Sequence, residues 1–480
     1  MKSRSSSLLL WLLIIYIFAL PFNGFSLLNI GNRGLLRVDW LGAGLLVGSV
    51  ILGLLTKRVE LRPSPNSKFV FIYILIATLS SINLWNSKMV RLLDFGTKYL
   101  QLIIVALVFF VLVFLELNDE DMKKVLRAWF LSSFLQSVYG LYQLVGRPLN
   151  LPFTTLELTN TSVARFGIQS YRTFSGFSQI SGFFKEPGWL GIYLLSSVIL
   201  FGVIILNKQD TKVLFSSRPR NWVIWGTQIV AMLLTGSLGA LGFFVVALVV
   251  MTLFRAIPRS KMINYFILIV FLMGLAIPIL QVLQIGYWDF IQVRLWGLYY
   301  NMLDPYGTPE VTSYQNRLDN SLRALDVWVK HPVLGVGLNQ IRYSDWQYVE
   351  EEQTGGASVN NGWATLLAEL GVMGFIAILL LVGATINQLR LLARQFADDD
   401  WWHVLLVSMM WVVLIEAVST LTTFNLMIHP LRWFTLAFAN LLIIEARKRV
   451  KKMPVEVASA DQKTLMAPSA TPAANITFGK

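Results

Sequence analysis

Long apolar stretches recur along the chain and alternate with short polar segments. A helix needs about 20 mostly apolar residues to cross the hydrocarbon core of a bilayer. The pattern predicts an all-α, polytopic membrane protein with about twelve spans. The expected spans cover residues 8–28, 38–55, 69–84, 98–117, 125–146, 187–206, 222–236, 239–254, 262–283, 361–386, 402–424 and 431–446.

The composition agrees with lipid as the solvent. Hydrophobic residues make up 55% of the chain and charged residues only 14%, whereas a soluble domain carries about 25% charged residues. The chain has no cysteine, which excludes disulfides, thiolate metal sites and a cysteine nucleophile.

The distribution of lysine and arginine predicts the orientation. With the N-terminus in the cytoplasm, 25 of the 40 basic residues fall on the cytoplasmic side, as expected for positively charged inner loops. Both termini should therefore lie inside, and the net charge of +13 requires no nucleic-acid partner. We expect a transmembrane domain over residues 1–446 and a disordered cytoplasmic tail over 447–480.

Two connecting segments on the predicted outer side are long, residues 147–186 and residues 284–360. The second lies between the ninth and tenth spans. Loops of this length are uncommon unless they are functional. Within the second, residues 315–330 have helical periodicity and place four apolar residues on one face, namely Leu318, Leu322, Leu325 and Val329.

Two arginines of this predicted helix have different neighbours. Arg323 has Asp319 and Asp326 within one turn on either side, which favours surface ion pairs. Arg317 has no acidic residue three or four positions away. An unpaired guanidinium beside a membrane suits a bidentate phosphate contact, with either a substrate or a lipid headgroup.

The sequence HPVLGVG follows the predicted helix, at residues 331–337. Its proline should end the helix, and Gly335 and Gly337 permit tight turns or close backbone approach. After a polar stretch come Asn360, Asn361 and the sequence LLAELGVMG. Its Glu369 lies inside the predicted tenth span, where a carboxylate is usually paired or functional. We expect a structural bridge from Glu369 to a loop arginine.

The order of Arg317, HPVLGVG, a polar loop, Asn361 and LLAELGVMG resembles the O-antigen ligase and polymerase superfamily. The sequence SGFFKEPGWLG, at residues 181–191, is similar to a proline-containing segment at the sixth span of many members. The resemblance implies a bacterial inner-membrane protein with about twelve spans and a large periplasmic loop between the ninth and tenth. It also implies glycan transfer from undecaprenyl diphosphate to an acceptor hydroxyl, without a metal, a cofactor or a nucleotide sugar. Membrane lipids and other polysaccharide-assembly proteins are further candidate partners.

The chain departs from the ligase pattern at two positions. Leu238 stands where ligases typically carry an arginine, and Asn360 stands where they carry a histidine proposed to activate the acceptor. Arg317 matches the functional arginine. We therefore expect a polymerase that joins undecaprenyl-diphosphate-linked oligosaccharide repeats. Ligase-type transfer of polymer to a lipid, glycan or protein is the alternative. A lipid-linked sugar flippase or transporter is a third hypothesis, but transporters commonly have repeated halves, and no internal repeat is visible.

This chemistry needs cations to hold the diphosphate and a base for the acceptor hydroxyl. The candidate catalytic residues are Arg317, Glu186 and His429. Glu186 precedes Pro187 and His429 precedes Pro430, so each has helix capping as its alternative role. The candidate substrate-binding residues are Arg165, Arg172, Lys185, Arg342, Asn360 and Asn361.

Overall fold

The structure is a computed structural model, and it describes most of the chain. The described residues are 3–30, 33–56, 64–85, 87–159, 169, 171, 173–174, 177–253, 286–303, 309–343, 361–397, 400–422 and 429–451. Helices dominate this part of the chain, so the predicted all-α class is confirmed. Candidate residues Arg165, Arg172 and Asn360 lie outside the described residues, as do the predicted span at 262–283 and the tail from residue 452.

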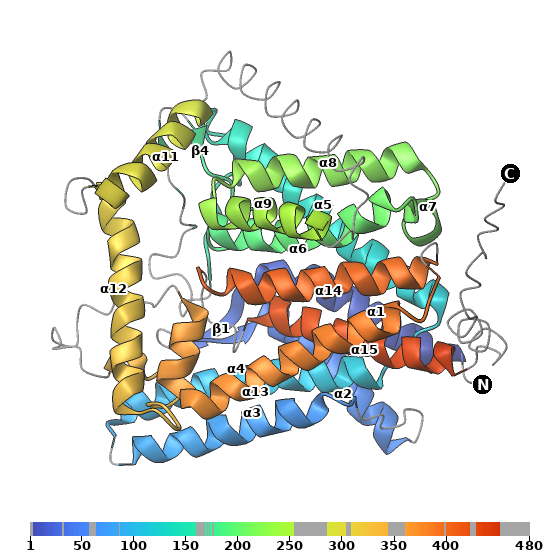
Figure 1. The fold of residues 1–480 in the computed structure, drawn as a ribbon, viewed down its shortest axis with the longest axis horizontal. Helices are drawn as coiled ribbons and strands as arrows, with labels where there is room; N and C mark the ends of the chain where they lie inside the picture. Colours follow the sequence, from blue (N-terminus) through green and yellow to red (C-terminus); the bar gives the residue numbers. More distant parts are fainter. Residues whose placement is uncertain are drawn as a thin grey trace, which may run out of the picture.

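Eleven helices of the described chain form a bundle in which α1 begins and α15 ends at the same end (Figure 1). They are α1 (Ser3–Ala19), α2 (Val38–Leu55), α3 (Ser67–Leu79), α4 (Met89–Phe114), α5 (Asp119–Gly146), α6 (Pro187–Leu206), α8 (Arg218–Leu234), α9 (Leu238–Leu253), α13 (Gly362–Ala393), α14 (Trp401–Ser419) and α15 (Pro430–Val450). The shorter elements are η1 (Leu20–Phe22), η2 (Ser80–Leu84), α7 (Asp210–Val213), η3 (Ile341–Tyr343), and the strands β1 (Ser26–Ile30), β2 (Arg33–Arg37), β3 (Thr173–Phe174) and β4 (Phe177–Ser178).

Several of these helices can cross a membrane. Among the described residues, six are long and apolar enough: Val38–Leu55, Ser67–Leu84, Met89–Phe114, Pro187–Leu206, Gly362–Ala393 and Trp401–Ser419. Leu8–Phe22 and Leu238–Thr252 are shorter apolar helices. Each predicted span within the described part overlaps a helix. The chain is therefore a multi-pass membrane protein, and the number of twelve spans stays a prediction.

The first predicted span, at residues 8–28, extends too far. Helix α1 ends at Ala19, Pro21 lies in the following 3-10 turn, and β1 pairs with β2 in an antiparallel hairpin. A proline lacks the amide hydrogen that a continuing helix needs. The hairpin also contacts the segment between α5 and α6, because the Ser26 amide donates to Thr159 Oγ1 at 2.7 Å.

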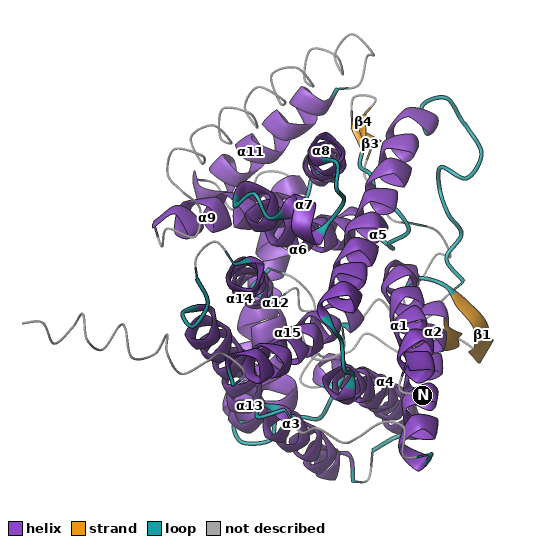
Figure 2. Cartoon of the chain, turned by 90° about the vertical axis from the view of Figure 1, so that its right-hand side faces the viewer, coloured by secondary structure: helices purple, strands orange, loops and turns teal. Residues whose placement is uncertain are grey.

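Helices α6 and α15 occupy the interior of the bundle, as the end-on view in Figure 2 shows for α15. Nearly every residue of α6 is buried, as is nearly every residue of α15 up to Ala446. Aromatic side chains fill the core around α15, where Trp129 packs edge-on against Phe434 at 5.1 Å between ring centroids. The first residues of α6 and α15 lie at the same end of the bundle. This end is opposite the one where α1 begins (Figure 1).

Helices α11 (Tyr287–Leu303) and α12 (Pro309–Lys330) lie beyond the end of the bundle where α6 begins, with α12 running across it (Figure 1). The helix predicted at 315–330 is thus present, and it begins six residues earlier. Its predicted apolar face is turned away from the bundle, since Leu322 is 51% and Val329 is 69% exposed. Ala324 and Val327 are buried instead, in a small cluster with Ala364 and Ala368 of α13.

Candidate functional site

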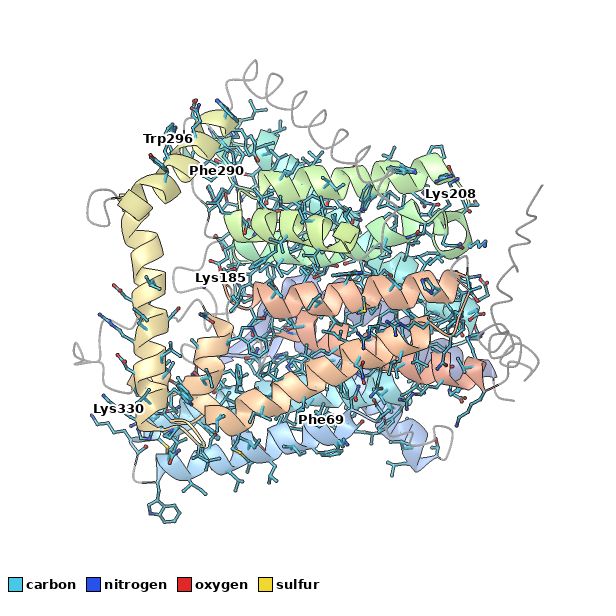
Figure 3. The ribbon with its side chains drawn as sticks, in the orientation of Figure 1. Phe69, Lys185, Lys208, Phe290, Trp296 and Lys330 are labelled. Carbon is cyan, nitrogen blue, oxygen red and sulfur yellow. The ribbon has the colours of Figure 1, made fainter. Side chains whose placement is uncertain are left out.

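Lys185 lies just before α6, at the end of the bundle that α12 crosses (Figure 3). Glu186 is the N-cap residue of α6 and has an extended backbone, and Pro187 follows in the first turn. The Glu186 carboxylate forms no capping hydrogen bond with that turn. Both Lys185 and Glu186 are half-buried. The predicted N-cap position of Glu186 is therefore confirmed, and its carboxylate forms no hydrogen bond with the helix start.

Polar side chains of α5 hold the loop that leads into Glu186. Gln143 Oε1 accepts from the amides of Ser181 at 3.0 Å and Gly182 at 2.9 Å. Gln136 Oε1 accepts from the Phe183 amide at 2.9 Å. Buried backbone amides need such partners where water is excluded. The loop is therefore fixed to α5, and it delivers Lys185 and Glu186 to a defined position.

His429 lies beside the start of α6. It is the N-cap residue of α15, and its ring packs against the ring of Trp189 with centroids 4.9 Å apart. Trp189 belongs to the first turn of α6, and its amide donates to the Glu186 carbonyl at 3.2 Å. The structure thus brings the segments that carry Glu186 and His429 together. His429 thus occupies the N-cap position, but its side chain forms no hydrogen bond with the first turn of α15.

The imidazole of His429 is held in its neutral form. Burial lowers the pKa of His429, and the positive charges of Arg432 and Arg37 lower it further. Its Nδ1 atom is buried and has no hydrogen-bond partner in the described part of the chain. A neutral imidazole with an unsatisfied nitrogen can accept a proton, although a lowered pKa makes it a weaker base.

A buried arginine, Arg432, lies one turn further along α15. Its guanidinium donates to Thr420 Oγ1 and, at 3.3 Å, to Ser419 Oγ, both at the end of α14. Nearby, Glu416 Oε1 accepts from Ser196 at 2.7 Å and from Thr435 at 3.0 Å. These contacts connect α6, α14 and α15 directly below the candidate site. Charged groups buried in a membrane protein need such partners.

Asn361 begins α13 close to this cluster. Its side-chain oxygen accepts from the amides of Trp363 and Ala364, both at 3.1 Å, and so caps the helix. The Gly362 amide donates to the carbonyl of Thr420 at 2.8 Å. Asn361 was expected to bind substrate, but its side-chain oxygen is used in the N-cap. Its amide nitrogen is the group that a substrate oxygen could contact.

Helix α13 is broken at Gly371, which has φ +63 and ψ −169. The turn at residues 331–337 replaces the helical hydrogen bonds that the break removes. The amides of Val336 and Gly337 donate to the carbonyls of Ala368 and Glu369, each at 2.9 Å. From the other side of the break, the Val372 amide donates to the carbonyl of Pro332 at 2.8 Å.

Glycine is required at this junction. A methyl group added at Gly371 would lie 2.2 Å from the carbonyl oxygen of Val333. One added at Gly335, which has φ +64, would lie 2.3 Å from the carbonyl carbon of Glu369. Gly337 has φ +105, again outside the range favoured by other residues. Glu369 is buried beside the turn, and its expected bridge to a loop arginine stays a prediction.

Helix α12 carries Arg317 and Arg323. The helix packs against α13 through Ala324 and Val327. Arg323, Asp319 and Asp326 are exposed. The side chains of Arg317 and Arg342 lie outside the described atoms.

The start of α9 lies beside the same cluster. A methyl group at Gly239 would lie 3.2 Å from Thr422 Oγ1, just beyond α14. Leu238, at the ligase arginine position, therefore begins α9 near the site. The sequence did not single out Arg432, although an arginine in the first turn of an apolar helix is a recognisable signal.

Comparison with known proteins identifies the region that carries α12 and the turn. Residues 223–379 match the family model described as O-antigen ligase. This part of the chain is similar to O-antigen ligases. No curated protein matches the chain. The resemblance found in the sequence is thereby confirmed, and it supports an enzyme of the glycosyltransferase-like ligase and polymerase type.

The matched region, residues 223–379, contains only part of the candidate site. Arg317, the turn at 331–337 and Asn361 fall within it, whereas Glu186 and His429 lie outside. The other residues of the candidate site come from α6, α14 and α15, which lie outside the matched region. The geometry of the site offers a half-buried carboxylate and a neutral imidazole, with a buried guanidinium beneath them.

Proposed function

We propose that this O-antigen ligase family protein is a polysaccharide polymerase. It joins oligosaccharide repeats linked to undecaprenyl diphosphate at the outer face of the bacterial inner membrane. The observation that supports this most directly is the meeting of the starts of α6 and α15, with Glu186 and His429, below the helix that carries Arg317.

In the proposed reaction, a hydroxyl oxygen of one lipid-linked repeat attacks the anomeric carbon of the sugar on another. The bond between that carbon and the diphosphate oxygen breaks, and undecaprenyl diphosphate leaves with the bonding electrons. Glu186 takes the hydroxyl proton, and His429 is the next candidate base. Positioned cations stabilise the charge that develops on the leaving phosphate.

Arg317 and Lys185 are the proposed diphosphate contacts. The planar guanidinium of Arg317 can bind two phosphate oxygens at once, whereas a lysine acts as a single point charge. Lys185 is half-buried next to Glu186, so a diphosphate held there would bring the anomeric carbon close to the base. Arg165, Arg172, Arg342, Asn360 and Asn361 remain proposed contacts for the glycan and its phosphates.

The polymerase is favoured over the ligase because of Leu238 and Asn360. A leucine cannot bind phosphate, and an asparagine amide is not a general base. These replacements remove the arginine that ligases typically carry and the histidine proposed to activate their acceptor, whereas Arg317 is kept.

Analysis of lipid-linked glycans in a deletion strain tests the proposal. A strain lacking the polymerase should accumulate single repeats, and the wild-type gene should restore long polymer. Accumulated lipid-linked polymer of normal length would identify a ligase instead. Single repeats retained on the cytoplasmic side would identify a flippase, and both results would contradict the proposal.

A further inference from the structure

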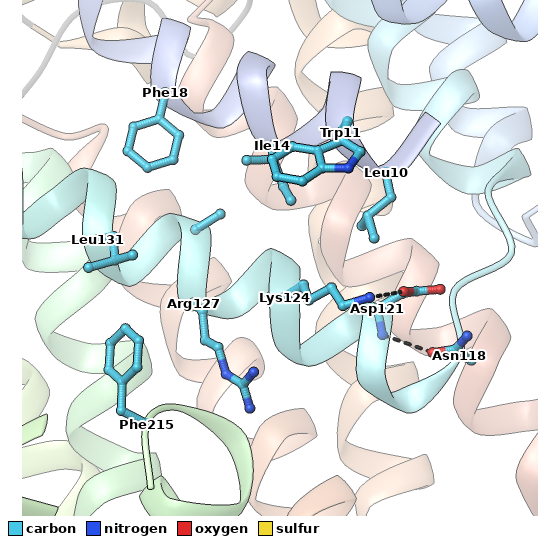
Figure 4. A pocket seen from close by; sticks show the side chains of 11 residues that line it. Leu10, Trp11, Ile14, Phe18, Asn118, Asp121, Lys124, Arg127, Leu131 and Phe215 are labelled. Carbon is cyan, nitrogen blue, oxygen red and sulfur yellow. Dashed lines mark hydrogen bonds and ion pairs between the residues drawn. The ribbon is translucent and has the colours of Figure 1, made fainter. Parts of the chain in front are cut away.

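A cavity of about 570 Å³ lies between α1 and α5, in the half of the bundle where both helices begin (Figure 4). It is remote from the candidate site, because α6 and α15 begin at the opposite end (Figure 1). Its volume is within the range of about 300–1,000 Å³ that small-molecule sites occupy.

The lining of this cavity is mostly apolar, with a charged group of side chains from the start of α5. Phe18, Leu131 and Phe215 lie on the side away from the Lys124–Asp121 pair (Figure 4). Lys124 forms an ion pair with Asp121 at 3.0 Å, in the first turns of α5. Such a division suits a molecule with a hydrocarbon chain and a charged headgroup.

Arg127 adds a second cation to the lining. Its Nε atom donates to the carbonyl of Leu214 at 2.6 Å. Its two terminal nitrogens donate no hydrogen bond within the described chain, so they are available to a phosphate. The lining carries Lys124 and Arg127 against Asp121, which gives a net charge of +1. Basic pockets between transmembrane helices on the cytoplasmic side bind anionic headgroups.

We propose that this cavity binds an anionic glycerophospholipid from the leaflet on the side where α1 begins. Its phosphate lies between Lys124 and Arg127, and one acyl chain lies along α1 towards Phe18. The predicted orientation makes this the cytoplasmic leaflet. The proposal does not depend on the polymerase reaction, because the two sites lie at opposite ends of the bundle. A lipid in this place would fill the space between α1 and α5 and stabilise their packing.

Native mass spectrometry of the full-length protein in detergent, titrated with phosphatidylglycerol or phosphatidylethanolamine, tests the proposal. We expect phosphatidylglycerol to bind about tenfold more tightly, which corresponds to about 1.4 kcal/mol. The double variant Lys124→Gln/Arg127→Gln should lose this preference. Lys123→Gln is the matched control, because Lys123 pairs with Glu120 at 2.7 Å and lies outside the cavity lining. This control should bind as the wild type does.

A second variant separates lipid binding from folding, since loss of Arg127 also removes the hydrogen bond to Leu214. Ile14→Trp fills the acyl end of the cavity and leaves both cations in place. It should weaken binding of both lipids about tenfold. Unchanged phosphatidylglycerol binding in both Ile14→Trp and the double variant would overturn the proposal. An equal loss in Lys123→Gln, or equal binding of the two lipids by the wild type, would also overturn it.

Discussion

Replacing Gly335 with alanine tests whether the turn at residues 331–337 locks the broken helix α13. Gly335 has φ +64, a conformation that costs other residues about 1–2 kcal/mol. The added methyl group would lie 2.3 Å from the carbonyl carbon of Glu369 and 2.6 Å from the carbonyl oxygen of Ala368. Both are backbone atoms, and overpacking a rigid site costs about 1–3 kcal/mol. We therefore expect Gly335→Ala to destabilise the protein by about 2–5 kcal/mol.

Gly383→Ala provides the matched control in the same helix. Gly383 is exposed, and nothing lies within 4 Å of the methyl group that alanine would add. Alanine is favoured over glycine inside a helix by about 0.5–1 kcal/mol. Purified variants in one detergent would be heated, and the fraction still monodisperse measured by size-exclusion chromatography. The midpoint should fall for Gly335→Ala and be unchanged or higher for Gly383→Ala. Equal midpoints for the two variants would refute the reasoning, because the backbone of Ala368 and Glu369 would then be able to move away from the added methyl group.

Three further predictions concern the base, pH and topology. Glu186→Gln keeps the shape of the side chain but removes its basicity, so it should abolish polymer at unchanged protein abundance; normal polymer length would direct the test to His429. Because its pKa is lowered in the folded protein, His429 should contribute to a loss of stability as pH falls below about 6.5, with a slope of at most about 1.4 kcal/mol per pH unit. In His429→Gln, the heating midpoint should decrease less between pH 7 and pH 5 than in the wild type. An equal decrease would contradict the burial of a neutral His429. Reporter fusions after Lys261 should report a cytoplasmic position and those near Gly355 an outside position; an inside signal at Gly355 would invert the proposed site.

The sequence predicted the helices well because apolar length is a strong local signal. The predicted spans of the described part overlap helices, and periodicity alone located α12. The hairpin β1–β2 was missed because its apolar residues continue directly from those of α1. The sequence also did not predict that the apolar face of α12, which includes Leu322, is turned away from the bundle. Periodicity identifies an apolar face, but it does not indicate which neighbour that face meets.

The candidate site was only partly accessible to sequence reasoning. Proline at the start of α6 and of α15 correctly placed Glu186 and His429 at helix starts. Their proximity depends on the packing of helices more than 200 residues apart, which no local pattern encodes. The break at Gly371 was not predictable either. The hydrogen bonds that α13 loses there are replaced by bonds to the turn around Gly335, which is distant in the sequence. The burial of Arg432 depends on partners from α14.

Polymer length in Arg317 variants tests the central claim most directly. Arg317→Lys retains the charge but removes the planar guanidinium, so it should lose polymer as fully as Arg317→Ala does. Arg323→Ala is the matched control on the same helix, because Arg323 is exposed beside Asp319 and Asp326, and it should retain long polymer. The measurement compares the three variants at equal abundance in the membrane. Full-length polymer in Arg317→Ala, or an equal loss in Arg323→Ala, would contradict the assignment of Arg317 to the diphosphate.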